Sequence, residues 1–442
     1  MNIKSQQAKN SFLFIFIYLC SLSLQPAFAT QSKEVITTDI WAATATVFKL
    51  VGEKAVNNVK LNWMQREDAD LYRIYRDGNC IGEAKGNTYD DYNLKADKTF
   101  TYHVEAFKEG KKIATSASQQ ATTFTPNGET KVYDNLNGKY ITKESAQKPQ
   151  GMKIGELYFS YKMENVEKEV DGQTLKGWLA TESFSPTGLN GSWSTSRELA
   201  FYPNVKFEGI AFRYNAKTGK VVLSAHYEDQ SGYVAAKIYL AQITPKGELE
   251  VGTMERPLGY DSRDQSLFID DDGTAYLLSA TNMNRDINIY KLDPSWTKPV
   301  LLVNTICKGL HRETPAIIKK DGEYYFFSSK ASGWYPSQTM YTSAADLGGE
   351  WTPMREIGNN STFDAQFNRI STVGKTCGVW SYHWGAQRKY KTPAGNFPRI
   401  SIAAFNKGYA SMDYYRYLEF SDKYGIIPVQ NGKNLTLNVP VT

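Results

Sequence analysis

The segment DGEYYFFSSK, residues 321–330, combines a turn signal with an apolar run. Asp-Gly favours a tight β-hairpin turn, and the aromatic residues behind it favour a buried strand. The same arrangement recurs four more times along the chain. The other copies are IGELYFSYK (154–162), TGKVVLSAHYE (218–228), DGTAYLLSAT (272–281) and VGKTCGVWSYHW (373–384).

The spacing of these hairpins predicts the fold. Their turn glycines are Gly155, Gly219, Gly273, Gly322 and Gly374. They recur at intervals of roughly 50 residues, and a period of that length with several strands per unit is typical of a propeller. The chain shows little helical periodicity. We therefore expect an all-β protein in which residues 131–442 form a five-bladed β-propeller.

Residues 35–125 form a separate unit. The runs VKLNWMQ (59–65), LYRIYRDG (71–78) and TFTYHVEAF (99–107) alternate apolar and polar residues, as half-buried strands do. A Trp in an early strand and a Tyr in a later one, here Trp63 and Tyr102, is a sandwich pattern. This unit resembles a fibronectin type III domain, so we expect a small β-sandwich before the propeller.

The first 29 residues are typical of a secretory signal peptide. Lys4 and Lys9 precede an apolar run, and Ala-Phe-Ala at 27–29 fits a cleavage site near Ala29. The apolar run is shorter than the roughly 20 residues that a membrane-spanning helix needs. A lipoprotein signal at Cys20 would require small residues before it, which Ile17-Tyr18-Leu19 does not supply. We expect a secreted or periplasmic protein without membrane insertion.

Composition narrows the class of partner. The net charge is only +5, from 51 basic and 46 acidic residues, which argues against nucleic acid as a partner. Tyr and Trp are abundant, at 29 and 9 residues, and their flat faces suit stacking on sugar rings. Beyond the leader, Cys80, Cys307 and Cys377 allow one disulfide, Cys307–Cys377, or three free thiols. No metal-ligand pattern or cofactor motif is present, and we expect a monomer.

Candidate site residues follow from aligning the blades on their turn glycines. The strand before each turn should be the innermost, and its first residues should face the central channel. The residues at these equivalent positions are Gln147, Glu208, Asp264, Glu313 and Gln366. Three of them are carboxylates. Like charges gathered in one cleft cost stability and shift pKa values, which indicates a functional site.

Carboxylates across a cleft with aromatic walls fit glycoside hydrolysis. One acid must be neutral to protonate the leaving oxygen, and another group must position or deprotonate water. A neighbouring carboxylate raises the pKa of the acid towards working pH. This arrangement assigns Glu313 as the acid and Asp264 as the residue that tunes it.

Three motifs carry a resemblance to a known family. SRDQSLFIDDDGTAYLL (262–278), HRETPAIIKKDGEYYFFSSKASGWYP (311–336) and STFDAQF (361–367) resemble glycoside hydrolase family 43, nearest its exo-β-1,3-galactanase branch. The resemblance implies a five-bladed propeller that inverts the anomeric carbon. It implies that Glu313 is the general acid and that Asp264 orients it. It also implies that Glu208 binds substrate and that Gln366 holds or activates the water.

One departure bears on substrate. Most of family 43 has an Asp base in blade one, where this chain has ESAQKPQGMKIG (144–155) without an Asp. The galactanase branch also lacks that base, so we expect an exo-acting enzyme on β-1,3-galactan or arabinogalactan. The alternatives are another family 43 specificity, such as a galactofuranosidase or arabinofuranosidase, and a glycan-binding propeller without catalysis.

Further candidates flank these positions, each with a structural alternative. Arg263 and Arg312 could brace a carboxylate or sugar hydroxyl, or form rim salt bridges. His226 could face the channel or satisfy a buried polar network. The aromatic candidates for a sugar-stacking wall, which could instead pack between blades, are Trp334, Tyr335, His383 and Trp384. Asp-Asp-Asp-Gly (270–273) is read as a hairpin turn rather than a calcium loop.

Overall fold

The computed structural model describes residues 43–51, 57–95, 98–123, 132–140, 151–189, 191–229, 232–385, 395–421 and 424–431. The predicted leader and Gln147 lie outside these residues. The described elements are strands and one turn of 3-10 helix, η2 (Pro257–Gly259). Within the described ranges, no helix has the length and apolarity that a membrane span requires.

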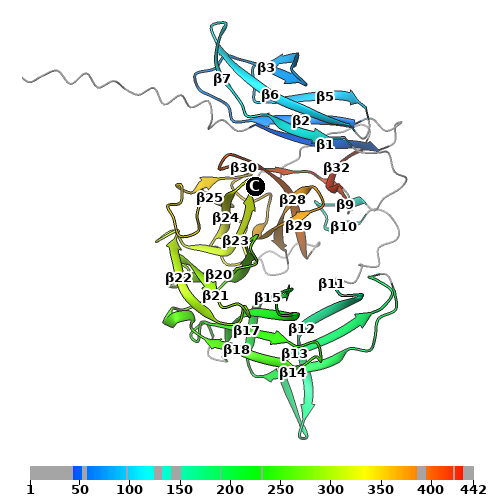
Figure 1. The fold of residues 1–442 in the computed structure, drawn as a ribbon, viewed down its shortest axis with the longest axis vertical. Helices are drawn as coiled ribbons and strands as arrows, with labels where there is room; N and C mark the ends of the chain where they lie inside the picture. The colour runs from blue at the N-terminus through cyan, green and yellow to red at the C-terminus, as the bar shows by residue number, and fades with distance from the viewer. Residues whose placement is uncertain are drawn as a thin grey trace, which may run out of the picture. The chain divides into compact units, whose positions relative to one another are not determined.

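Five four-stranded antiparallel sheets follow one another along the chain, each with its strands in sequence order (Figure 1). Blade one consists of β11 (Met152–Ile154), β12 (Leu157–Val170), β13 (Gln173–Ser185) and β14 (Arg197–Pro203). Blade two consists of β15 (Lys206–Asn215), β16 (Lys220–Glu228), β17 (Lys237–Ile243) and β18 (Leu249–Glu255). Blade three consists of β19 (Gln265–Ile269), β20 (Ala275–Thr281), β21 (Asp286–Leu292) and β22 (Pro299–Ile306).

Blade four consists of β23 (Arg312–Lys320), β24 (Glu323–Lys330), β25 (Met340–Ala344) and β26 (Arg355–Glu356). Blade five consists of β27 (Gln366–Val373), β28 (Thr376–Trp384), β29 (Asn396–Asn406) and β30 (Tyr409–Tyr414). The predicted five-bladed β-propeller is confirmed. The predicted turns are also present: Asp321 and Gly322 both have positive φ, 51° and 83°, as a two-residue hairpin turn requires.

The continuous apolar run of β24 is explained by packing on both of its faces. Side chains alternate between the faces of a strand. Phe327 packs into a cluster with Phe367 and Val379 of blade five. Phe326 packs on the other side, into a cluster with Leu278 and other residues of blade three. Both phenylalanines are fully buried, and burial of each side chain stabilises the fold by about 1.5–3 kcal/mol.

Eight strands precede the propeller. They are β1 (Ala43–Val51), β2 (Asn57–Trp63), β3 (Leu71–Arg76), β4 (Asn79–Ala84), β5 (Thr88–Leu94), β6 (Thr99–Lys108), β7 (Lys111–Thr115) and β8 (Gln119–Thr122). Their two sheets share one core that includes Trp63, Tyr72 and Tyr102. The buried Tyr102 hydroxyl donates to Asp91 at 2.7 Å. The core is that of a sandwich, while its assignment as fibronectin type III stays a prediction.

The strands that flank the blades were not anticipated. β9 (Val132–Asp134), β10 (Lys139–Tyr140), β31 (Tyr417–Ser421) and β32 (Gly425–Asn431) join one seven-stranded sheet, in the order β10-β9-β31-β32-β1-β2-β5. The blades therefore occupy a narrower range than 131–442. These strands escape the repeat because they lack the Gly-turn hairpin that marks each blade.

Candidate active site

Four predicted site residues lie at or beside the start of an inner strand. Glu208 and Glu313 lie near the starts of β15 and β23, Gln366 opens β27, and Asp264 directly precedes β19. These first strands form one edge of their sheets, and β15, β19, β23 and β27 contact one another in that order. The four residues that the turn glycines align therefore lie on strands that are neighbours in space.

Three of the inner strands are irregular just beyond the site residue. Pairing shifts between Glu208 and Ala211, between Glu313 and Ala316, and between Phe367 and Arg369. Gly209 and Thr314 have positive φ, 61° and 52°, within the first two irregularities. A β-bulge of this kind bends the strand and changes the direction of a side chain, and such bulges are common beside active sites.

Glu313 is held between two side-chain amides. Asn284 Nδ2 donates to one carboxyl oxygen at 2.9 Å, and Gln366 Nε2 donates to the other at 3.1 Å. Burial, together with the charge of Asp264, raises the pKa of Glu313 to about 7, against the two amide hydrogen bonds. Near neutral pH this carboxyl is therefore protonated in a substantial fraction of molecules, as a general acid must be.

Asp264 links two blades. Its Oδ2 accepts a hydrogen bond at 3.0 Å from the backbone N–H of Thr314, the residue after Glu313. Burial raises the pKa of Asp264, and the charge of Glu208 acts in the same direction, while the Thr314 N–H acts against both. Asp264 thus contacts the backbone next to Glu313, and its charge raises the pKa of the Glu313 carboxyl, while its role in catalysis stays a prediction.

The amide of Gln366 has a defined orientation. Trp384 Nε1 donates to Gln366 Oε1 at 2.9 Å, and an indole N–H can only donate. The amide oxygen must therefore face Trp384, so the NH2 group faces Glu313 and, at 3.4 Å, Ser329 Oγ. Trp384 thus contributes to the site through its N–H, which the prediction of a stacking wall did not include.

Glu208 is the anionic member of the cluster. Its carboxylate lies 2.8 Å from Lys206 Nζ, and it accepts a hydrogen bond at 2.8 Å from the Tyr233 hydroxyl. Burial would raise its pKa, but hydrogen bonds from His226, Lys206 and Tyr233 outweigh burial and lower it to about 2. Glu208 and Glu313 therefore have pKa values far apart, the pattern that separates an ionised carboxylate from an acid.

His226 lies between two carboxylates. Its Nδ1 is 3.5 Å from Glu208, and its Nε2 is 2.7 Å from Glu228, which is 1% exposed. Imidazole donates from both nitrogens only as imidazolium. The ring forms a buried polar pair with Glu228 and lies beside Glu208, and a site role for His226 stays a prediction.

Arg312 and His383 lie inside their blades. Arg312 is buried, and its guanidinium donates to the Ser328 hydroxyl and carbonyl and to the Gln338 carbonyl. Burial lowers its pKa to about 10. His383 Nδ1 is 3.1 Å from Asp364 Oδ2, and its ring stacks on Phe397. These contacts favour structural roles, so the predicted sugar contacts of both residues are left without support.

The remaining candidates lie nearer to solvent. Arg263 is 3.3 Å from the Tyr233 carbonyl and lies over the Tyr233 ring. Trp334 and Tyr335, which follow β24, are each 53% exposed. Trp334 and Tyr335 are therefore exposed enough to stack on a sugar ring. Arg263 contacts Tyr233, the residue whose hydroxyl donates to Glu208.

The contact residues that were not predicted include Lys206, Glu228, Tyr233 and Asn284. Lys206 and Glu228 each lie two positions from a predicted residue, Glu208 and His226, on the same strand. The period of two in β-strands could have identified them. Tyr233 and Asn284 come from loops outside the repeat, and a loop residue carries no periodic signal.

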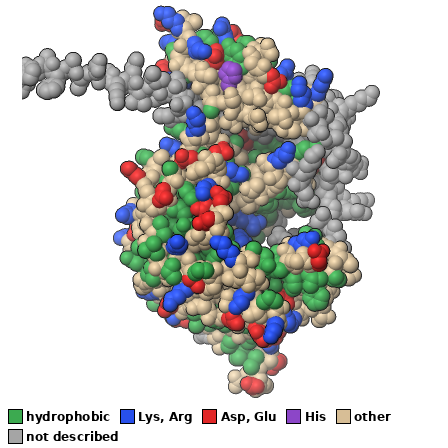
Figure 2. All heavy atoms as spheres, in the orientation of Figure 1, with side chains coloured by type: hydrophobic (Ala, Val, Ile, Leu, Met, Phe, Trp, Pro, Cys, Tyr) green, Lys and Arg blue, Asp and Glu red, His purple; other side chains and the backbone are tan. Residues whose placement is uncertain are grey.

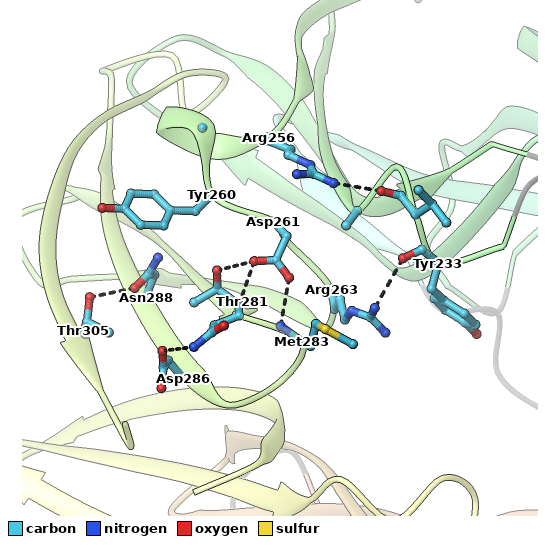
Figure 3. A pocket seen from close by; sticks show the side chains of 14 residues that line it. Tyr233, Arg256, Tyr260, Asp261, Arg263, Thr281, Met283, Asp286, Asn288 and Thr305 are labelled. Atoms are coloured by element: carbon cyan, nitrogen blue, oxygen red, sulfur yellow. Dashed lines mark hydrogen bonds between the residues drawn. The ribbon is translucent and has the colours of Figure 1, made fainter. Parts of the chain in front are cut away.

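A pocket of about 660 Å³ adjoins the cluster (Figure 3). Its lining includes Tyr233, Tyr260, Asp261, Arg263 and Met283, so it meets the cluster at Tyr233 and Arg263. Glu208, Asp264 and Glu313 do not line it. We therefore locate the candidate active site at the three carboxylates and not in this pocket.

The remaining acidic residues and the cysteines form no further candidate site among the described residues. Among the described residues, no group of three or more His, Cys, Asp or Glu side chains could hold a metal ion. Asp270 instead accepts from Lys319 and Tyr324, and Asp272 from Thr274, as hairpin residues. Cys80, Cys307 and Cys377 are free thiols.

Comparison with known proteins agrees with the geometry. The model of glycosyl hydrolases family 43 matches residues 249–379, which include Asp264, Glu313 and Gln366. A comparison with curated proteins gives no match. The propeller fold and the matched segment together resemble the glycoside hydrolases of family 43, and the carboxylate cluster lies largely within that segment.

Two solved structures that are similar to this chain are galactanases. An exo-β-1,3-galactanase from Clostridium thermocellum is 25% identical with a TM-score of 0.51, and the match covers 68% of each chain. An exo-β-1,3-galactanase from Phanerochaete chrysosporium, solved with β-1,3-galactotriose, is 23% identical with a TM-score of 0.50 and shares the fold. That match covers 67% of this chain and 68% of the fungal one.

Proposed function

We propose that this protein is an exported, exo-acting glycosidase that hydrolyses β-1,3-galactan or arabinogalactan chains with inversion. The observation that carries the proposal is Glu313, a carboxyl held by Asn284 and Gln366 with a pKa raised to about 7 by burial and Asp264. The likeness to the Clostridium thermocellum enzyme supports the substrate class. The signal-peptide pattern of residues 1–29 supports export.

Glu313 donates its proton to the leaving glycosidic oxygen. Asp264 keeps that proton in place near neutral pH, because a second negative charge beside it is unfavourable. Glu208 stays ionised and accepts sugar hydroxyls near the reacting carbon. Gln366 orients Glu313 through its NH2 group, and the remaining lone pair of its Oε1 can hold the attacking water.

The test is product analysis on β-1,3-galactobiose and arabinogalactan by anomeric NMR. We expect galactose to be released with initial α configuration, as inversion of a β-linkage requires. Glu313→Gln should lower turnover by about 10²–10⁴-fold, the usual contribution of a general acid. Glu323→Gln is the matched control, because Glu323 lies at the opposite end of the same hairpin and should leave turnover unchanged.

Other results would redirect the assignment. Wild-type turnover in Glu313→Gln would contradict the role of Glu313. Activity confined to galactofuranoside or arabinofuranoside substrates would contradict the galactan specificity. Glycan binding without product, unaffected by Glu313→Gln, would show a binding propeller rather than an enzyme.

A further inference from the structure

The turn between β20 and β21 has an unusual backbone. Asn282, Met283 and Asn284 have φ of 51°, 55° and 63°, so three consecutive residues are left-handed. None is glycine, and L residues adopt this conformation only at a cost in free energy. Met283 is also 71% exposed, so burial of its side chain does not compensate for that cost. Other contacts must hold the turn.

Asp261 supplies those contacts (Figure 3). Its Oδ1 accepts hydrogen bonds from the Asn282 backbone N–H at 2.7 Å and from the Thr281 hydroxyl at 2.9 Å. Its Oδ2 accepts from the Met283 backbone N–H at 3.0 Å. Successive N–H groups of such a turn form a concave anion site, and here the Asp261 carboxylate occupies it.

The last residue of the turn reaches the candidate acid. Asn284 Nδ2 donates to Glu313 Oε1 at 2.9 Å. The amide therefore depends on the backbone that Asp261 holds. A second anchor fixes the other end of the turn, where Asp286 accepts from the Asn282 side chain at 2.9 Å and from the Gly309 N–H at 2.8 Å.

We propose that Asp261 is a positioning residue for Glu313: it holds the left-handed turn 282–284 and thereby keeps the Asn284 amide against the acid. The inference rests on the proposed role of Glu313, which it extends to a residue of the neighbouring pocket. Asp261 itself has no contact with the reacting atoms in this scheme.

The proposal predicts the direction in which the pKa of Glu313 changes. The groups that act on Glu313 are Asp264, whose charge raises its pKa, and Arg263, Gln366 and Asn284, which lower it. Loss of the Asn284 hydrogen bond should therefore raise the pKa of Glu313. Removing the Asp261 charge alone would act in the opposite direction, because one fewer negative charge favours an ionised Glu313. An upward shift in the pKa of Glu313 would therefore show that the turn has moved, because loss of the Asp261 charge alone would lower that pKa.

Asp261→Asn and Asn284→Ala are the primary variants. Asparagine keeps the shape but directs an NH2 group at a backbone N–H. Each variant should lower kcat/KM about tenfold and move its basic limb to higher pH. The double variant should be no worse than either single one, because both changes break the same contact. Asp271→Asn, which removes an exposed carboxylate at the far end of β19, should change neither quantity.

Met283→Gly provides a rescue. Glycine adopts positive φ without strain, so this change should restore part of the activity and the wild-type basic limb in the Asp261→Asn background. A role of Asp261 in stability alone would lower the unfolding temperature without moving the basic limb, and its effect would add to that of Asn284→Ala. Either result would overturn the proposal.

A readout without substrate separates this inference from the proposed function. The Glu313 carboxyl can be titrated by ¹³C NMR in glutamate-labelled protein, with Glu313→Gln to assign its signal. An upward shift in both Asp261→Asn and Asn284→Ala supports the positioning role even in a protein without galactanase activity. An unshifted Glu313 in folded Asp261→Asn contradicts it whatever the activity.

Discussion

Glu313 depends on its neighbours for its chemistry. Burial and Asp264 favour its neutral form, and the two amides favour its ionised form. The balance lies near pH 7, where an acid catalyst can both hold and release a proton. Glu208, with Lys206, Tyr233 and His226 around it, shows how the same residue type becomes a permanent anion a short distance away in the fold.

The pH dependence tests this balance. Activity that requires protonated Glu313 should fall as pH rises through about 7. Stability should fall as pH rises from the ordinary value of 4.5 to about 7, because the folded-state pKa is raised. Asp264→Asn removes the neighbouring charge, so the basic limb of kcat/KM should move to lower pH. Measuring kcat/KM against pH for both proteins checks this, and an unmoved limb would contradict the role of Asp264.

At the scale of elements, the site depends on the starts of the inner strands. A regular strand would place alternate side chains on opposite faces of its sheet. The irregularities after Glu208, Glu313 and Phe367 break that alternation near the starts of the strands. The adjacent strand then completes the site, as β28 does when Trp384 orients Gln366 at the start of β27.

Trp384→Phe tests the contribution of β28. Phenylalanine retains an aromatic face but removes the N–H, so the Gln366 amide can rotate away from Glu313. We expect kcat to fall about five- to tenfold with little change in KM, the effect of one hydrogen bond. The matched control is Trp380→Phe, also on β28, which removes an indole N–H bonded to Ser371 of β27. Equal effects of the two changes would refute a specific role for Trp384.

At the scale of the whole molecule, the segment before blade one is anchored to blade five. Asn135, which is fully buried, donates to the carbonyls of Ile400 and Tyr415 and accepts from the Ile400 N–H. The Tyr133 hydroxyl donates to the Pro398 carbonyl at 2.6 Å. The same segment also pairs through β9 with β31, the strand that follows blade five, so side-chain and backbone hydrogen bonds both link it to the C-terminal part of the described chain.

Asn135→Ala should therefore destabilise the protein. It removes three hydrogen bonds to the backbone of Ile400 and Tyr415, at a cost of about 2–4 kcal/mol. Asn137→Ala serves as the control, because Asn137 is exposed and its side chain bonds only Asp134 among the described contacts. Urea unfolding followed by tryptophan fluorescence measures both. Equal midpoints for the two variants would show that this anchor does not stabilise the fold.

Charge distribution agrees with a glycan partner. On the face in Figure 2, basic and acidic side chains are interspersed rather than gathered into one field. The chain has a net charge of +5 over 442 residues. Neutral sugar chains are recognised by hydrogen bonds and aromatic contacts, which do not require a strong electrostatic field.

The sequence by itself determined the blade number, the inner strands and the alignment of Glu208, Asp264, Glu313 and Gln366. Those features follow from a repeated pattern of a Gly-turn and a buried strand. Such a pattern lies within consecutive residues, so it can be recognised in the sequence. Only the tertiary structure decided that Asn284 and Tyr233 contact the cluster, that Trp384 does so through its N–H, and that Arg312 and His383 lie inside their blades. Those roles depend on which loops and strands meet in space, and no spacing along the chain encodes that meeting.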